Sequence, residues 1–214
     1  MKKNQIIYRF IAQAALQNKK TKFVMRDIAR TLKISPNTVS LTVKSLVNIG
    51  AVTQYGNYFS ISDFNKLIDF WAVKRDISKD IIYQTYADIE ESEIEKMMPS
   101  EVAFTCYSAY VLLFGNDASD YSGVYVYASD KGLKEIKMRF PEKKLSERSK
   151  YFNITVLKPD QLLSNMIDNG ATIKSSVSVP QLYVDLWNTK DWYAYEFLKK
   201  LKIKIDDMYA KAVL

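Results

Sequence analysis

The segment 34–50 carries signals for both ends of a helix. Ser35 is a preferred N-cap residue, and Pro36 fits the first helical position because its missing N–H is not needed there. Gly50 can adopt the left-handed backbone conformation in which many helices end. Between these ends, apolar residues recur at the spacing of one buried stripe: Val39, Val43, Leu46 and Val47. The segment therefore predicts a helix over 36–49.

The opposite face of this helix is short, polar and unhindered. Its members are Asn37, Thr38, Ser40, Leu41, Lys44 and Ser45. Small polar side chains on one helix face suit the major groove of DNA, where they can approach the base edges. We therefore interpret 36–49 as a candidate DNA-contacting helix.

Positive charge is concentrated in the first part of the chain. Residues 1–62 contain ten Lys and Arg against one acid, Asp27, which gives a net charge of +9. Residues 63–214 contain 21 basic and 23 acidic groups, which gives −2. A basic surface is often simply solvated, but an excess of this size in so short a segment favours a polyanion partner.

Other predicted elements complete a small domain around 36–49. Apolar periodicity predicts a first helix that ends near 17, and a second helix follows a short strand at 23–24. The outward side chains at the second helix are Arg26, Arg30 and Lys33. Residues 51–61 predict a hairpin with its turn at 55–57. Two short helices joined by a tight turn form a helix-turn-helix, to which the hairpin would add a wing.

This order of elements resembles a winged helix-turn-helix DNA-binding domain over residues 1–62. The motifs that carry the resemblance are Asp27-Ile28-Ala29-Arg30, Ser35-Pro36-Asn37-Thr38-Val39-Ser40 and Leu46-Val47-Asn48-Ile49-Gly50-Ala51-Val52. The resemblance implies that helix 36–49 enters the major groove and that the wing tip reaches the DNA backbone or the minor groove. The DNA-binding residues expected are Arg26, Arg30, Lys33, Ser35, Asn37, Thr38, Ser40, Leu41, Lys44, Tyr55, Asn57 and Tyr58.

Leu41 departs from this pattern, because a polar or basic residue is more usual at its position. Its side chain suits the methyl group of thymine, or alternatively a contact with protein. Some winged helices bind only proteins, and this remains the alternative for the whole domain.

The remainder of the chain predicts a linking helix over 63–79 and an α/β domain over 80–214. Strands are expected at 81–86, 123–128, 152–156 and 171–177, and helices at 88–99, 105–114, 160–167 and 192–202, followed by a short terminal helix. A further helix is expected from a cap at Asp130 to residue 139. The strand at 152–156 alternates as if one side faced water. We predict an α+β fold: an N-terminal winged helix-turn-helix, a linking helix, and a C-terminal α/β domain with a mixed sheet.

A second resemblance covers most of the chain. The order of Phe104-Thr105-Cys106-Tyr107-Ser108-Ala109-Tyr110, Val124-Tyr125-Val126-Tyr127 and Pro180-Gln181-Leu182-Tyr183-Val184-Asp185-Leu186-Trp187 is similar to that of the antitoxin in type IV, AbiE-type toxin–antitoxin systems. The resemblance implies a regulator that represses its own operon at promoter repeats and neutralises a nucleotidyltransferase-like toxin. Gln181, Tyr183 and Asp185 are candidates for binding that partner. The alternative is structural, with Tyr183 in a core and Asp185 capping a loop.

Common catalytic patterns are missing from the sequence. With no histidine, neither a Ser-His-Asp nor a Cys-His site can form, and the single cysteine, Cys106, lies in an apolar segment. The phosphate-binding motifs G-x-x-x-x-G-K-[ST] and G-x-G-x-x-G do not occur. Gly115-Asn116-Asp117 with Asp120 only partly matches the Gly-Ser turn and paired aspartates of a nucleotidyltransferase. We therefore predict a protein that is not an enzyme and has no catalytic residue.

We also expect no cofactor and no metal site. The glutamates at 90, 91, 93 and 95 suit a solvated helix face better than a metal site, because adjacent side chains point in different directions. No run of about 18 uncharged apolar residues and no secretion signal is evident, so we expect a cytoplasmic location and no membrane partner. A homodimer is possible. The alternative function is a winged-helix repressor whose C-terminal domain binds a small molecule.

Overall fold

The computed structural model describes residues 1–143, 151–170 and 176–213. Contacts between Cα atoms divide the chain into two units, Met1–Arg75 with Leu201–Leu214 and Asp76–Lys200, named here the first and second units. The division after Arg75 puts the helix that we expected as a linker inside the first unit. Each unit combines helices with a sheet, which confirms the mixed α and β composition expected from the sequence.

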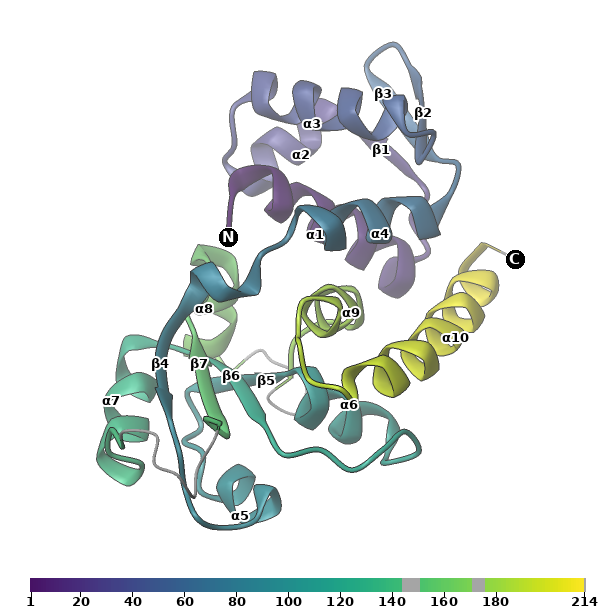
Figure 1. Cartoon of the computed structure of the whole chain (residues 1–214). Helices are drawn as coiled ribbons and strands as arrows, with labels where there is room; N and C mark the ends of the chain where they lie inside the picture. The colour runs from purple at the N-terminus through teal and green to yellow at the C-terminus, as the bar shows by residue number, and fades with distance from the viewer. Residues whose placement is uncertain (144–150, 171–175, 214) are drawn as a thin grey trace. The chain divides into compact units, whose positions relative to one another are not determined.

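The first unit contains four helices before the division and a small antiparallel sheet. The helices are α1 (Lys3–Asn18), α2 (Met25–Leu32), α3 (Pro36–Asn48) and α4 (Phe64–Lys74). The strands are β1 (Lys22–Val24), β2 (Val52–Tyr55) and β3 (Tyr58–Ile61), in the order β1-β3-β2. Helix α1 packs against both α3 and α4, so that these helices enclose a core (Figure 1).

The core of the first unit is apolar and aromatic. Trp71 of α4 is fully buried, and the rings of Phe23 in β1 and Phe59 in β3 stack with centroids 5.5 Å apart. The C-terminal part of the chain belongs to the same core, because Tyr209 stacks on Phe64 with ring centroids 4.5 Å apart. Burying aromatic rings in this way contributes several kcal/mol, since truncation of a core Phe costs about 3–5 kcal/mol.

The second unit is built on a four-stranded mixed sheet. Its strands are β4 (Ile81–Thr85), β5 (Val102–Thr105), β6 (Val124–Ala128) and β7 (Ile154–Leu157), in the order β4-β7-β6-β5. Strands β6 and β7 are parallel, and the other two pairs are antiparallel. The helices are η1 (Ile77–Asp80), α5 (Glu91–Lys96), α6 (Cys106–Phe114), α7 (Asp130–Arg139), α8 (Gln161–Asp168) and α9 (Val179–Trp187). The mixed sheet expected in this part of the chain is confirmed.

Several expected elements begin or end elsewhere. The helix predicted from residue 105 starts at Cys106, and the preceding strand β5 was missed because all four of its residues are buried and show no alternation. Helix α5 begins at Glu91 rather than at 88, with Glu90 as its N-cap residue. Strand β7 is buried on both faces, which corrects the expectation that one side faced water; Thr155 is only 2% exposed.

The C-terminal part of the chain also differs from the expectation. Helix α10 runs without a break over Ala194–Val213, where we had predicted a helix to 202 and a separate short one. The strand predicted over 171–177 falls mostly outside the described residues. Of its described part, Ser176 forms an isolated parallel bridge with Phe104.

Candidate nucleic-acid interface

Local interactions set the start of α3. The Ser35 hydroxyl accepts a hydrogen bond of 3.3 Å from the Thr38 backbone N–H and lies 2.7 Å from the Thr38 hydroxyl. The turn before it is closed by a 3.0 Å hydrogen bond from the Ile34 N–H to the Ala29 carbonyl, with Lys33 in the left-handed region at φ 52°. At the other end Gly50 has φ 71°, as its predicted role requires. The orientation of α3 is therefore fixed at both ends.

The two faces of α3 differ as predicted, except that Val47, which was expected in the buried stripe, is only half-buried. Val39, Val43 and Leu46 are fully buried, and Thr42 is also buried, with its hydroxyl donating to the Thr38 carbonyl at 2.7 Å. Residues on the opposite side are exposed: Asn37, Ser40, Leu41 and Lys44. Leu41 is the exception in chemistry, since it is apolar and yet 58% exposed.

Hydrogen bonds separate the polar residues of this face into two groups. The Ser35 hydroxyl caps the helix and is hydrogen-bonded to the Thr38 hydroxyl, and the Ser45 hydroxyl donates to the Leu41 carbonyl at 3.1 Å. Within the described part of the chain, the side chains of Asn37 and Lys44 form no hydrogen bond or ion pair. The residues predicted to contact DNA therefore include both helix-capping groups and groups that are free for a ligand.

The expected cations of α2 and the turn after it are exposed, but they are not equivalent. Arg26 and Lys33 are exposed. Arg30 donates to Asp27 at 2.8 Å, and both side chains of this pair are largely in water. Such a surface pair is weak, but Asp27 reduces the positive potential that Arg30 presents.

The β2–β3 hairpin presents two aromatic rings. Tyr55 and Tyr58, 50% and 39% exposed, stack with centroids 5.3 Å apart. Gly56 permits the tight turn between them through its φ of 61°. The carbonyl of exposed Asn57 accepts a hydrogen bond of 3.1 Å from the N–H of Met25, which ties the hairpin tip to the start of α2.

The charge asymmetry becomes larger when it is counted by structural unit. The first unit has 16 Lys and Arg against 5 Asp and Glu, a net charge of +11. The second unit has 15 basic against 19 acidic groups, a net charge of −4. The exposed face of α3 thus belongs to a unit with a strong excess of positive charge, which attracts polyanions.

Gln181, Tyr183 and Asp185 lie inside the second unit, on α9. Their exposed fractions are 1%, 3% and 0%, which does not match the predicted contact with a protein partner. Asp185 accepts hydrogen bonds of 2.9 Å from Thr105 and Tyr127 and one of 2.8 Å from Gln181. The structural alternative fits Tyr183, which is buried, whereas Asp185 joins α9 to the sheet rather than capping a loop.

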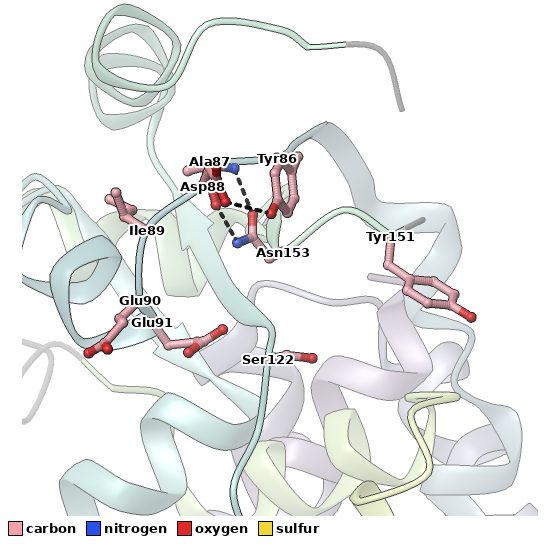
Figure 2. Close-up of a pocket in the computed structure, with 9 residues that line it drawn as sticks. All are labelled: Tyr86, Ala87, Asp88, Ile89, Glu90, Glu91, Ser122, Tyr151 and Asn153. Atoms are coloured by element: carbon pink, nitrogen blue, oxygen red, sulfur yellow. Dashed lines mark hydrogen bonds between the residues drawn. The ribbon is translucent and has the colours of Figure 1, made fainter. Parts of the chain in front are cut away.

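A pocket of about 670 Å³ lies in the second unit (Figure 2). Its residues come from the segment after β4, from Ser122 before β6, and from the segment before β7, and they are Tyr86, Ala87, Asp88, Ile89, Glu90, Glu91, Ser122, Tyr151 and Asn153. The Asn153 side chain accepts from the Ala87 N–H at 2.9 Å and donates to the Ala87 carbonyl at 2.8 Å. Sequence reasoning did not identify this pocket, because Ser122, Tyr151 and Asn153 are distant in the chain from residues 86–91.

Acidic and phenolic groups set the electrostatics of this pocket. The Tyr86 hydroxyl donates to Asp88 at 3.1 Å, and this hydrogen bond, followed by burial, raises the pKa of Tyr86. Asp88 and Glu90 are exposed and Glu91 is half-buried. The lining therefore favours a cation over an anion.

The residues considered for catalysis have structural environments. Cys106 is buried in the first turn of α6. Asp117 accepts a hydrogen bond of 2.5 Å from Tyr110. Over residues 1–143, 151–170 and 176–213, no group of three or more His, Cys, Asp or Glu is placed to hold a metal ion.

Comparison of the chain with protein-family models, with curated proteins and with solved structures finds no match. In the described ranges no helix has the length and apolarity needed to cross a membrane. Of the two candidate sites, the exposed face of α3 has the clearer chemistry, because it combines free polar side chains with the charge of the first unit.

Proposed function

We propose that the protein is a DNA-binding transcriptional regulator whose first unit is a winged helix-turn-helix. In this proposal α2 and α3 form the helix-turn-helix, α3 enters the major groove, and the β2–β3 hairpin is the wing. The single observation that carries the proposal is the outward face of α3. It presents Asn37 and Lys44 unbonded to other described residues, in a unit of net charge +11.

The arrangement around α3 supports this proposal. A helix that lies in a groove needs a fixed orientation, and α3 is fixed by the Ser35 cap, by its buried stripe and by the left-handed turn at Lys33. The hairpin tip is tied to the start of α2 through Met25, so hairpin and helix-turn-helix form one framework. Arg26 and Lys33 add exposed positive charge next to α3, where phosphates would lie.

The proposal is tested by measuring binding of the full-length protein to the DNA upstream of its own gene. Fluorescence anisotropy between 50 and 200 mM salt is expected to show specific binding that weakens steeply with salt, as phosphate contacts require. An unrelated duplex of equal length provides the control. Absence of binding at the lowest salt concentration would contradict the proposal.

We further propose that the regulator is the antitoxin of an AbiE-type system, which represses its own operon and neutralises a nucleotidyltransferase-like toxin. The support is the order of sequence motifs together with their packing. Thr105, Tyr127 and Asp185 each come from a different motif, and they meet in one hydrogen-bonded cluster in the second unit. The motifs therefore describe one packed core rather than three unrelated segments.

The antitoxin proposal is tested by co-expression with the neighbouring gene. We expect that gene to stop growth when expressed alone, and growth to return when this protein is co-expressed. A neighbouring gene without toxicity, or toxicity that this protein leaves unchanged, would contradict the antitoxin role. Neither result bears on DNA binding, which the anisotropy experiment measures separately.

The pocket in Figure 2 favours a second candidate function, a regulator controlled by a small molecule. Its carboxylates and tyrosine rings suit an organic cation. Thermal denaturation with and without polyamines or arginine distinguishes this function: a ligand raises the melting temperature with concentration and also changes the affinity for DNA. If none of these compounds changes the melting temperature, the small-molecule function is contradicted.

A further inference from the structure

Three exposed side chains on α3 form a single stripe. At about 100° per residue, Leu41 and Lys44 lie about 40° and 20° to either side of Asn37 around the helix axis. Val39, Val43 and Leu46, which are fully buried, lie on the opposite side. At a rise of 1.5 Å per residue the stripe is about 10 Å long, which corresponds to roughly three base-pair steps.

The chemistry of this stripe differs from one position to the next. The Asn37 amide has both a donor and an acceptor, and this combination matches the N6 donor and N7 acceptor that adenine presents in the major groove. Leu41 has neither, and the thymine methyl group is the one apolar feature of the base edges in that groove. Lys44 carries a point charge that suits a phosphate.

The exposure of Leu41 matters because of its place in the stripe. Its side chain is 58% exposed and lies between Asn37 and Lys44, so a partner that binds these two residues also covers apolar surface. Its neighbours along the stripe are a polar amide and an ammonium group, so a purely apolar partner would leave Asn37 and Lys44 without polar contacts. DNA with a thymine at this position covers Leu41 and also offers a base edge and a phosphate to its neighbours.

We infer that this face of α3 selects A·T base pairs, with Leu41 contacting a thymine methyl group and Asn37 pairing with adenine one to two steps away. The inference rests on the proposed DNA-binding function, which it deepens by naming the bases that are recognised. Lys44 anchors the same face to the backbone and adds affinity without sequence preference.

Base analogues test the two contacts separately in the full-length protein. In the bound upstream duplex, each thymine is replaced in turn by uracil, which removes only the methyl group. At one position or more, affinity of the unaltered protein is expected to fall about three- to fivefold, as loss of one buried methyl group predicts. Leu41→Ala is expected to bind more weakly and to be insensitive to that replacement, whereas Leu41→Met retains the sensitivity.

Asn37 is tested with 7-deazaadenine, which lacks the N7 acceptor. We expect about a tenfold loss of affinity at one adenine for the unaltered protein and no further loss for Asn37→Ala. Lys44→Ala is the control, because it weakens binding to all duplexes and keeps both base sensitivities. Circular dichroism verifies that each variant is folded.

The possible outcomes distinguish the selection of A·T base pairs from DNA binding itself. Salt-dependent binding without any sensitive thymine would overturn the inference and leave DNA binding intact. Equal sensitivity in Leu41→Ala and in the unaltered protein would overturn the role of Leu41, assigning the methyl contact elsewhere. If the upstream DNA is not bound at all, both the function and the inference fail.

Discussion

The hydroxyl of Thr105 donates a hydrogen bond of 2.9 Å to the carboxylate of Asp185, 80 residues further along the chain. Tyr127 donates to the same carboxylate oxygen, also at 2.9 Å. Asp185 is fully buried, so these donors replace water around the carboxylate. The cluster joins α9 to β5 and β6 and holds the second unit together.

Replacing Asp185 is expected to destabilise the protein strongly. Asp185→Ala removes the carboxylate to which the buried hydroxyls of Thr105 and Tyr127 donate, and we expect a loss of about 3–5 kcal/mol in the free energy of unfolding. Asp185→Asn keeps one acceptor oxygen and should lose less. Urea denaturation at pH 7 measures both variants against the exposed control Asp168→Asn. A loss below about 1 kcal/mol for Asp185→Ala would show that the cluster contributes little.

The cap of α3 gives a prediction for the first unit. Ser35→Ala removes the side-chain acceptor of the Thr38 N–H, and the expected cost is about 1 kcal/mol, measured as a lower melting temperature. Ser35→Asp should restore stability because aspartate is an equally good N-cap residue. The control, Ser40→Ala, lies on the same helix without a capping role. Equal melting temperatures for Ser35→Ala and the unaltered protein would remove Ser35 from this role.

Salt dependence tests the contact predicted for Lys44. If Lys44 neutralises a phosphate, Lys44→Ala should weaken DNA binding and reduce the magnitude of the slope of log affinity against log salt by about 1. The matched control is Lys134→Ala, which removes the same charge from an exposed position of the second unit. An unchanged slope for Lys44→Ala would exclude a phosphate contact.

Alkaline pH is expected to destabilise the second unit through its buried tyrosines. Burial, and then nearby groups, raise the pKa of Tyr107 above the ordinary value of 10.0, and burial followed by hydrogen bonding to Asp117 does the same for Tyr110. A raised pKa means that the folded state holds its protons more tightly than the unfolded state. The contribution of these tyrosines to stability is therefore fully present below pH 10, the ordinary tyrosine pKa. The free energy of unfolding declines as the pH rises above that value.

Urea denaturation between pH 7 and 11 measures this decline. Tyr107→Phe removes one of the tyrosines whose pKa is raised. The free energy of unfolding of this variant should therefore fall less steeply above pH 10 than that of the unaltered protein. Tyr195→Phe, which alters a ring that is 66% exposed, serves as the control. Identical slopes for the three proteins above pH 10 would show that Tyr107 does not contribute.

Elements with local signals could be predicted from the sequence. The ends of α3 depend on Ser35, Pro36 and Gly50 themselves, and the structure confirms a helix over Pro36–Asn48. The β2–β3 hairpin likewise depends on the turn at Gly56. Propensity and capping act over a few residues, which is why such elements can be identified without knowledge of the tertiary fold.

Features that depend on distant contacts could not be predicted. Strand β5 is short and buried, and its identity comes from pairing with β6 rather than from its own pattern. Sequence reasoning interpreted Asp185 as a partner contact or, alternatively, as a loop cap, because nothing local indicates that Thr105 and Tyr127 supply its hydrogen bonds. The pocket of Figure 2 was missed for the same reason, since Asn153 meets Ala87 across 66 residues.

The stacking of Tyr209 on Phe64 has a consequence for the order in which the two units are completed during synthesis. The first unit draws on Met1–Arg75 and on Leu201–Leu214, and the whole second unit lies between them in the chain. During translation all residues of the second unit leave the ribosome before Leu201–Leu214, so the first unit is complete only after Tyr209 has emerged. A chain cut short by premature termination would thus lack part of the first unit, even with α3 fully synthesised.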